Sequence, residues 1–332
     1  MKKNSLIFLF IAALLSLLWL IGIKWQLGVP TPGSRWVSEA YQLKIAAANN
    51  TKGPKVLIVA GSNAMFGYDS RRLSNYYQRP VINLAVNAGL GLPYILYSAR
   101  QTAKAGDIVL LPLEYALLVN EPTFNAQIID YVVARDLDYW RQLGRWQQLQ
   151  IAAAMSADRW WQGLRHLPDV PVIGGTYGAH HLNAVGDQTH TAATDRSQAD
   201  KDAVGRAKTW NYGALDRQDH GAWDLLAGFA KWAQRNQVCL IGLPTILLDR
   251  PSYHQDAVER AFFGGLPRRF QALGITYLGQ PYDFMYPSDQ FFDTDHHLQD
   301  NARRLHTERV IALLQAHPET ACQSDRKPAD KQ

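Results

Sequence analysis

The chain has 332 residues, of which 47% are hydrophobic and 19% charged, and its formal net charge is +5 at pH 7. A chain of this length and composition can bury a full core, and its size fits one large domain with additions. No block of Lys or Arg and no basic stripe with interleaved aromatic residues stands out, which argues against nucleic acid as a partner. The mild basicity is more typical of a protein beside a membrane surface or an anionic polymer.

An uncharged apolar segment over residues 5–23 follows Lys2 and Lys3. At about 1.5 Å per residue it nearly matches the hydrocarbon thickness of a bilayer. It is longer than the apolar region of a typical signal peptide and no small-residue cleavage site follows it, although cleavage as a signal peptide is the alternative. The lysines favour a cytoplasmic tip at 1–4 and a single-pass anchor in a bacterial inner membrane, with the remaining chain in the periplasm.

Residues 24–52 are expected to form a tether between membrane and domain. A buried strand then begins at Lys55 and is broken by Ala60-Gly61, so that Ser62 stands where the strand gives way to a turn. In an open α/β sheet, ligands and chemistry collect at the carboxyl ends of strands. A serine there can act as a nucleophile, and its neighbouring backbone N–H groups can stabilise an oxyanion.

A strand–helix alternation follows. The pattern predicts a helix over 69–78, a strand over 80–85, a helix over 93–104 and a strand over 107–112. A glycine-rich turn containing Gly89 and Gly91 precedes the second helix, and the N–H of Gly89 (or of Gly91) is the candidate second oxyanion donor because glycine permits close backbone approach.

The last of these strands ends at Glu114-Tyr115, which is expected to face the cleft. Glu114 would there orient a substrate hydroxyl or hold a cation, or it would cap a helix or pair with an arginine. Together with Gly89 and with Asn63, which follows Ser62, these two residues make up the predicted oxyanion and substrate-binding group.

The middle of the chain, about 120–220, fits no strand–helix alternation. It is expected to be an insertion of helical pieces and loops, an arrangement typical of a lid, a binding loop or a disordered segment. His180, His181 and His190 lie in it, but no cysteine and no helical His-x-x-x-His spacing accompanies them. We therefore expect neither a metal site nor a cofactor.

Regular structure is predicted to return as a helix over 222–235, a strand over 238–244, a helix over 253–273 broken at Gly264-Gly265, and a strand over 275–278. Cys239 falls in one of these strands and Cys322 in the polar tail, 316–332, which is expected to be flexible. We interpret Cys239 as a small core residue, because a buried strand and a frayed tail are poorly placed partners for a bridge.

A histidine pair, His296-His297, precedes a predicted amphipathic helix over 299–315, and Asp293 and Asp295 stand just upstream. A carboxylate beside an imidazole fixes its tautomer and stabilises the imidazolium that forms when the base takes a serine proton. With Ser62, these residues give the chain order Ser…Asp-His.

That order resembles the SGNH/GDSL hydrolase superfamily, in which an early G-x-S supplies the nucleophile and a late D-x-x-H supplies the acid and the base. The resemblance is closer to membrane-anchored DltD-, AlgJ- and AlgX-like proteins, which are associated with membrane-bound O-acyltransferases. It extends over about residues 53–315, with the middle unmatched, and is carried by the segments 60–67, 81–91, 106–115 and 292–298.

The nucleophile block departs from the family pattern. Ala60 stands where the family has a glycine, and aligning Gly61 there would put Asn63 at the nucleophile position. Ser62 is preferred, because that register also aligns the glycine and the acid that follow. The third block offers Glu114 where the hydrolases have an Asn as oxyanion donor.

The choice of base and acid is open in part. His297 is favoured as the base because Leu298 follows it as in the family pattern. Its acid is either Asp295, two residues before it, or Asp293, four residues before it. If His296 were the base, Asp293 would have the hydrolase spacing of three.

The resemblance implies a three-layer, SGNH-hydrolase-like (flavodoxin-like) α/β domain with a parallel sheet and an insertion, behind one N-terminal transmembrane helix. It implies a periplasmic O-acyltransferase that modifies an extracellular or cell-envelope polysaccharide, such as an exopolysaccharide, by O-acetylation through a serine acyl-enzyme. A membrane-bound O-acyltransferase or polysaccharide-synthase machinery would be its partner. The alternatives are an SGNH esterase or deacetylase, and a non-catalytic accessory or glycan-binding partner of the acyltransferase.

Overall fold

The computed structural model describes residues 2–165, 169–170, 175–216 and 221–318. The chain divides into two compact units, one formed by Met1–Glu39 with Thr123–Gly175 and the other by Ala40–Pro122 with Thr176–Gln332. Each is described by itself. The expected insertion over 120–220 is thus divided between the units, and the expected tail falls mainly on 319–332, outside the described residues.

The first unit is helical. Its elements are α1 (Lys2–Gln26), the first part of α2 (Pro32–Asn50), α7 (Ala126–Arg135), α8 (Leu137–Gln142), α9 (Arg145–Ala154) and α10 (Ala157–Leu164). Helix α1 is long and apolar enough to cross a membrane. Residues 24–52, expected as a tether, consist mostly of the end of α1 and of α2.

A buried arginine joins α1 to the helices that come later in this unit. Arg159 on α10 is 4% exposed, and its guanidinium donates to Gln26 Oε1 at 2.8 Å and to the carbonyl of Val29 at 2.9 Å. It also forms an ion pair with Asp130 on α7, whose carboxylate accepts from the Thr31 hydroxyl at 2.7 Å. The end of α1 is therefore part of a folded polar core.

The second unit contains a five-stranded sheet in the order β2-β1-β3-β4-β6, and every neighbouring pair is parallel. The strands are β1 (Val56–Ile58), β2 (Val81–Asn83), β3 (Ile108–Leu111), β4 (Cys239–Gly242) and β6 (Thr276–Tyr277). All five predicted strands are present. Numbered among themselves they follow the order 2-1-3-4-5 of flavodoxin-like sheets. A separate parallel pair, β5 (Leu247–Leu248) and β7 (Met285–Tyr286), was not anticipated.

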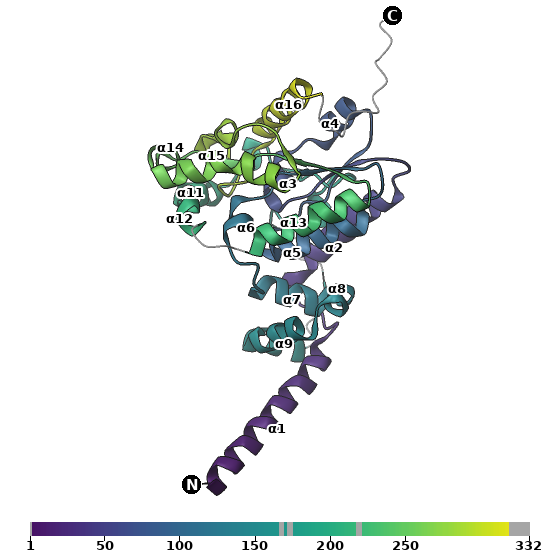
Figure 1. Ribbon diagram of the computed structural model, residues 1–332, viewed down its shortest axis with the longest axis vertical. Coiled ribbons are helices and arrows are strands. Elements are labelled where there is room, and N and C mark those ends of the chain that lie inside the picture. Colours follow the sequence, from purple (N-terminus) through teal and green to yellow (C-terminus); the bar gives the residue numbers. More distant parts are fainter. Residues whose placement is uncertain (1, 166–168, 171–174, 217–220, 319–332) are drawn as a thin grey trace, which may run out of the picture. The chain divides into compact units, whose positions relative to one another are not determined.

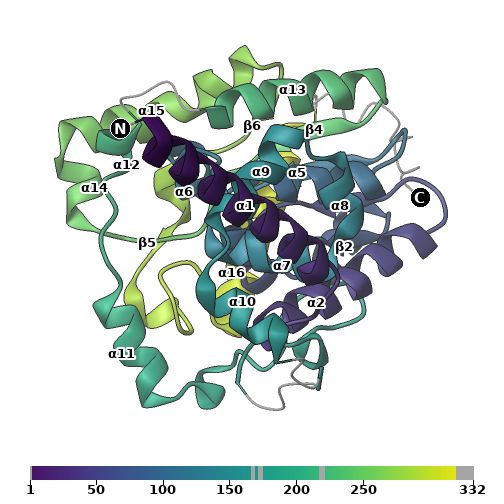
Figure 2. The ribbon, with the colours of Figure 1, turned by 90° about the horizontal axis from the view of Figure 1, so that it is seen from below.

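Alternate residues of the strands enter two different hydrophobic clusters, one on each face of the sheet. Leu57 and Val109 belong to the cluster that includes residues of α5 and α13, whereas Ile58 and Leu110 belong to the one that includes residues of α3 and α16. The covering helices are α3 (Ser62–Gly67), α4 (Ser70–Tyr77), α5 (Gly91–Thr102), α13 (Gly221–Arg235), α15 (Ala257–Ala272) and α16 (Asp300–Ala316). Figure 1 shows α5 beside α13, and Figure 2 shows α13 and α15 near β4 and β6.

The remaining elements of this unit are short. They are α6 (Tyr115–Val119), α11 (Gln198–Arg206), α12 (Tyr212–Leu215), α14 (Pro251–Gln255) and the 3₁₀ helices η1 (Ala88–Leu90), η2 (Ala179–His181), η3 (Ala193–Asp195), η4 (Pro281–Phe284) and η5 (Ser288–Gln290). The helix predicted over 253–273 is not broken at its glycines. The break falls at Asp256, whose side chain accepts from the N–H groups of Val258 and Glu259 and so starts α15.

Cys239, interpreted from the sequence as an unbridged core residue, is disulfide-bonded in the structure. The expectation assumed that the strand buries the sulfur, but Cys239 is the first residue of β4 and is only partly buried. Cys322 lies outside the described residues.

Lys44 on α2 is fully buried among carbonyl groups. Its ammonium group donates to the carbonyl of Gly186 at 2.6 Å and to that of Ala85. Burial lowers the pKa of Lys44 to about 7, against the opposing effect of the Asp187 carboxylate. In an unfolded chain a lysine titrates near its ordinary value, about 10.4.

This difference predicts a pH-dependent stability. Between pH 7 and 10 the unfolded chain holds a proton at Lys44 that the folded chain has released, so the free energy of unfolding should rise with pH by about 1.4 kcal/mol per unit. The contribution is complete above about pH 10 and absent below pH 7. Urea unfolding of the detergent-solubilised protein at pH 7, 8 and 9 should show this rise in the wild type and in Lys52→Met, an exposed control. Lys44→Met should lack it, and equal slopes in all three proteins would contradict the assignment.

Candidate active site

The order of the sheet reverses direction between β1 and β3, the position at which open α/β sheets bind ligands. The two strands pair in register from Val56 with Ile108 to Ile58 with Leu110. Because they are parallel, their carboxyl ends lie at the same edge. Ser62 follows β1 and Glu114 follows β3, so the pairing brings together the two segments that the sequence analysis singled out.

Ser62 is the first residue of α3 and is partly exposed. The residue before it must be a glycine: a Cβ on Gly61 would lie 2.4 Å from Glu114 Oε1 and 2.5 Å from the backbone nitrogen of Ala88. Asn63 is completely buried, and its side-chain amide donates to the Pro112 carbonyl at 2.8 Å and to the Thr245 hydroxyl. Of the two alternatives for the nucleophile, the geometry therefore favours Ser62, and it gives Asn63 a structural place instead of the expected substrate contact.

Glu114 closes the turn around Ser62. It is 3% exposed, and its two carboxylate oxygens accept from the N–H of Gly61 at 2.9 Å and from the N–H of Asn63 at 3.2 Å. Burial raises the pKa of the Glu114 carboxyl, although His296 and the two backbone donors act in the opposite direction. Both oxygens are thus occupied by backbone groups at the start of α3, which corresponds to the helix-capping alternative and not to contact with a substrate hydroxyl or a cation.

The acidic and basic residues lie in a tight loop before α16. Phe291 and Leu298 form an antiparallel bridge, and the N–H of Phe292 donates to the carbonyl of His297 at 2.7 Å. Within this loop His297 Nδ1 lies 2.7 Å from Asp293 Oδ1. Burial raises the pKa of Asp293, but hydrogen bonds from His297 and Tyr177 and the attraction of the imidazole outweigh it and leave that pKa below its ordinary value.

The other two candidates in the loop face elsewhere. His296 places its Nδ1 2.9 Å from the carbonyl of Ile246, and its Nε2 lies 3.8 Å from Asp295 Oδ1. The backbone carbonyl of Asp295 accepts from the N–H of Leu248. Asp295 also does not cap the following helix, because α16 begins at Asp300 with Gln299 as its N-cap. Of the alternatives that the sequence left open, the structure pairs His297 with Asp293.

The imidazole of His297 lies against the helix that carries Ser62. The rings of His297 and Phe66 are stacked, with their centroids 3.9 Å apart and an interplanar angle of 6°. Phe66 is four residues after Ser62, so both side chains emerge from the same face of α3, and that of Phe66 leans toward the N-terminus of the helix. Among the described residues, His297 Nε2 and Ser62 Oγ make no hydrogen bond. Catalytic hydrogen bonds are often long before substrate binds.

The two glycines predicted as second oxyanion donors have their N–H groups engaged. The N–H of Gly89 donates to the side chain of Asn87 at 2.7 Å, and that of Gly91 donates to the carbonyl of Ala88. The N–H of Ala88 makes no hydrogen bond to the described part of the chain, and its nitrogen lies against Gly61. The N–H of Ser62 is similarly available within the described residues. Two adjacent backbone donors near a serine hydroxyl fit the requirement for stabilising an oxyanion.

Tyr177 is a site residue that sequence reasoning missed. Its hydroxyl donates to Asp293 Oδ2 at 2.6 Å and lies 3.3 Å from His297 Nδ1. Burial, the Asp293 charge and this hydrogen bond raise the pKa of Tyr177 well above its ordinary value, so it remains a neutral donor. It stands in a polar stretch without periodicity, and nothing in the pattern there distinguishes this tyrosine from others.

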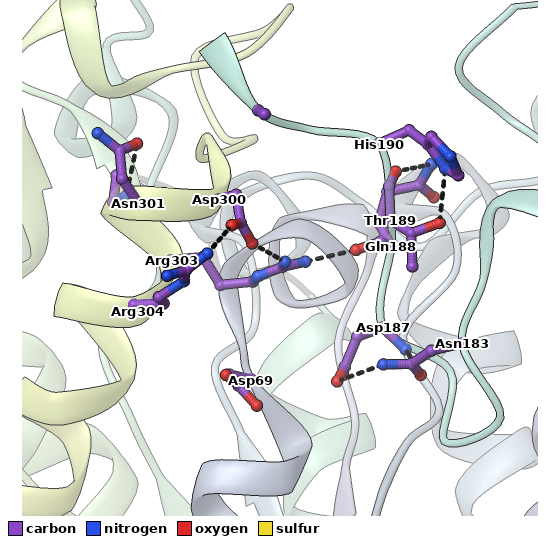
Figure 3. A network of polar contacts seen from close by, with 12 residues as sticks. Asp69, Asn183, Asp187, Gln188, Thr189, His190, Asp300, Asn301, Arg303 and Arg304 are labelled. Carbon is purple, nitrogen blue, oxygen red and sulfur yellow. Dashed lines mark hydrogen bonds and ion pairs between the residues drawn. The ribbon is translucent and has the colours of Figure 1, made fainter. Parts of the chain in front are cut away.

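Polar contacts hold the segment after Tyr177 to other elements of the second unit (Figure 3). Asp187 accepts from the Ser70 hydroxyl at 2.6 Å and from the Asn83 side chain at 3.0 Å. Arg303 on α16 contacts both Asp300 and the carbonyl of Gln188, as Figure 3 shows. This part of the expected insertion is thus held against α4, β2 and α16.

Tyr115, which was also predicted to face the cleft, belongs to the core. It is 1% exposed and packs edge-on against Tyr212, Phe262 and Phe263.

The three histidines of the middle segment lie close together. The ring of His181 lies between those of His180 and His190, with centroid distances of 4.2 and 4.8 Å. Within the described residues, no group of His, Cys, Asp and Glu forms a metal-binding arrangement.

Comparison of the sequence with models of protein families gives no match, and a search of curated proteins finds no relative. A serine hydroxyl, an imidazole held by a partly buried carboxylate, and backbone donors without a partner in the described residues form the set of groups used in acyl transfer through a serine ester.

The two carboxylates should differ sharply in their effect. Asp293→Asn replaces the carboxylate by an amide, whose NH₂ group can donate to His297 Nδ1 and so favour the wrong tautomer, and the comparable change in serine-protease triads lowers turnover on the order of 10⁴-fold. Asp295→Asn changes only a nearby screened charge, worth about 1 kcal/mol, so its loss should be roughly tenfold or less. Turnover of an activated ester by both variants, with circular dichroism to verify folding, tests this. Equal small losses would remove Asp293 from the site.

Tyr177→Phe should lower turnover of the same ester by roughly 10- to 100-fold, because a hydrogen bond to a charged group contributes about 1.5–3 kcal/mol. The variant keeps the ring, so its packing against Phe66 should survive. Tyr76→Phe, on α4, serves as a control for loss of a hydroxyl and should leave turnover unchanged. If Tyr177→Phe also retained full turnover, the hydroxyl would have no part in holding Asp293.

Proposed function

We propose that this chain is a membrane-anchored O-acyltransferase of the SGNH type, which acylates an extracellular or cell-envelope polysaccharide through a serine acyl-enzyme. The observation that carries the proposal is the Asp293–His297 pair stacked on Phe66, one helical turn after Ser62. The position of Ser62 at the point where the sheet order reverses supports it further.

In the first half-reaction, Ser62 Oγ attacks the acyl carbon of the donor while His297 Nε2 takes the hydroxyl proton. The N–H groups of Ser62 and Ala88 bind the oxyanion, and His297 returns the proton to the leaving group. In the second half, a sugar hydroxyl attacks the serine ester and His297 takes its proton. The bond between Ser62 Oγ and the acyl carbon then breaks, and His297 returns the proton to Ser62 Oγ as the acylated sugar leaves. Asp293 stabilises the imidazolium in both halves.

Membrane anchoring is part of the proposal. The contact of Gln26 with the buried Arg159 supports retention of α1, because cleavage in this region would remove a hydrogen-bonding partner of a buried guanidinium. The disulfide at Cys239 supports an oxidising compartment such as the periplasm.

The nucleophile is tested by labelling and by trapping. A fluorophosphonate should modify the wild type and Asn63→Ala, provided that variant folds, but not Ser62→Ala. Brief reaction with an acetyl ester should leave an acetyl group on Ser62, detected by mass spectrometry. Transfer of that group to added polysaccharide supports a transferase, whereas release only to water would make the protein an esterase. Absence of label in the folded wild type would favour a non-catalytic partner of an acyltransferase.

A further inference from the structure

The second half of α1 is not a free helix. The indole nitrogen of Trp19 donates to the carbonyl of Ala152 on α9 at 2.8 Å. The rings of Trp19 and Trp160 on α10 have centroids 5.0 Å apart. A Cβ on Gly22 would lie 2.0 Å from the Trp160 ring, so the glycine is what permits this close approach. Both α9 and α10 therefore contact α1 within its apolar segment.

The position of these contacts along α1 indicates how deep they would lie in a bilayer that α1 crosses. At about 1.5 Å per residue, Trp19 lies roughly 6 Å and Leu15 roughly 12 Å inside the end of the apolar run at Ile23. A bilayer core is about 30 Å thick, so the whole run is needed to cross it. Groups that contact α1 between Leu15 and Trp19 then lie at the depth of lipid.

An apolar groove lies at this depth, beside the part of α1 from Leu15 to Leu20. Its volume is about 560 Å³, and Leu15, Trp19 and Leu20 on α1 and Trp146, Leu149 and Ala153 on α9 are among its lining residues. Trp146 is 71% exposed and Leu149 45% exposed. The exposed apolar side chains of α9 continue the exposed apolar surface of α1.

Basic and aromatic residues are also exposed on α9 and α10. Arg145 precedes Trp146 and is exposed. On α10, Trp161 is 55% exposed, and the Arg165 guanidinium lies 5.2 Å from its ring centre. Tryptophan beside arginine is typical of helices that lie in the membrane interface, where the ring contacts acyl chains and the cation contacts anionic headgroups.

We propose that α9 and the groove between α9 and α1 form a membrane-binding surface, the membrane seat, whose central residues are Trp146 and Leu149. The membrane seat lies in the lipid leaflet that contains the C-terminal end of α1, and it binds phospholipid acyl chains. Arg145 meets the headgroups. The seat rests on the anchoring proposed above, and it adds a second, monotopic contact with the bilayer.

The test uses the full-length protein in vesicles of phosphatidylethanolamine and phosphatidylglycerol. The photoreactive residue p-benzoylphenylalanine is placed in separate variants at Trp146, at Leu149, at Leu9 on α1 as a positive control, and at Leu305 on α16 as an exposed apolar control in the other unit. Mass spectrometry after irradiation should detect lipid adducts at Leu9, Trp146 and Leu149, and none at Leu305.

Adducts at Leu9 without adducts at Trp146 and Leu149 would overturn the seat and leave the anchor intact. Their absence at Leu9 as well would overturn the anchor, and the seat with it. The same variants irradiated in native membranes should again yield lipid adducts. Protein adducts in place of lipid at Trp146 and Leu149 would overturn the proposal in favour of a docking surface for an integral membrane protein.

Discussion

The parallel pairing of β1 with β3 is the constraint on which the candidate site depends. It brings the turn after Ile58 and the turn after Leu111 to one edge of the sheet. Glu114 can then reach across and accept from the backbone N–H groups on both sides of Ser62. A buried carboxylate is costly unless its oxygens are hydrogen-bonded, so this contact and the strand pairing stabilise each other. The same close approach of Glu114 leaves no room for a side chain at Gly61.

The position of His297, the candidate base, depends on a second and independent set of contacts. The Phe291–Leu298 bridge folds the loop so that Asp293 and His297, four residues apart outside any helix, come into hydrogen-bonding distance. Phe66 then fixes the plane of the imidazole from α3, and Tyr177 fixes the carboxylate from the segment that follows the helical unit. Three stretches distant in sequence, the 291–298 loop, α3 and the segment of Tyr177, thus meet at one imidazole–carboxylate pair. The loss of any one would change orientation more than charge.

The helical unit has a different physical basis. Its centre is polar, with Arg159 satisfied by the carbonyls and side chain at the end of α1 and by Asp130. An apolar N-terminal helix that supplies partners to a buried guanidinium is integrated into the fold. Arg159 gives the C-terminal end of α1 a structural role. The exposed tryptophans of α9 and α10 add to the apolar surface that α1 itself exposes.

The sequence by itself determined the apolar helix and the five strands of the sheet, because each depends on local pattern: a long uncharged run, and short apolar runs bounded by turn residues. It also singled out Ser62 and His297 as candidates. Tertiary structure alone paired His297 with Asp293 instead of Asp295 and engaged the N–H of Gly89. It also turned Glu114 and Asn63 into supports of the backbone and brought in Tyr177. These outcomes depend on which backbone donors are already occupied and on which side chains approach from distant segments. Spacing along the chain carries no information on either, because hydrogen bonds across a fold are set by the packing of its elements.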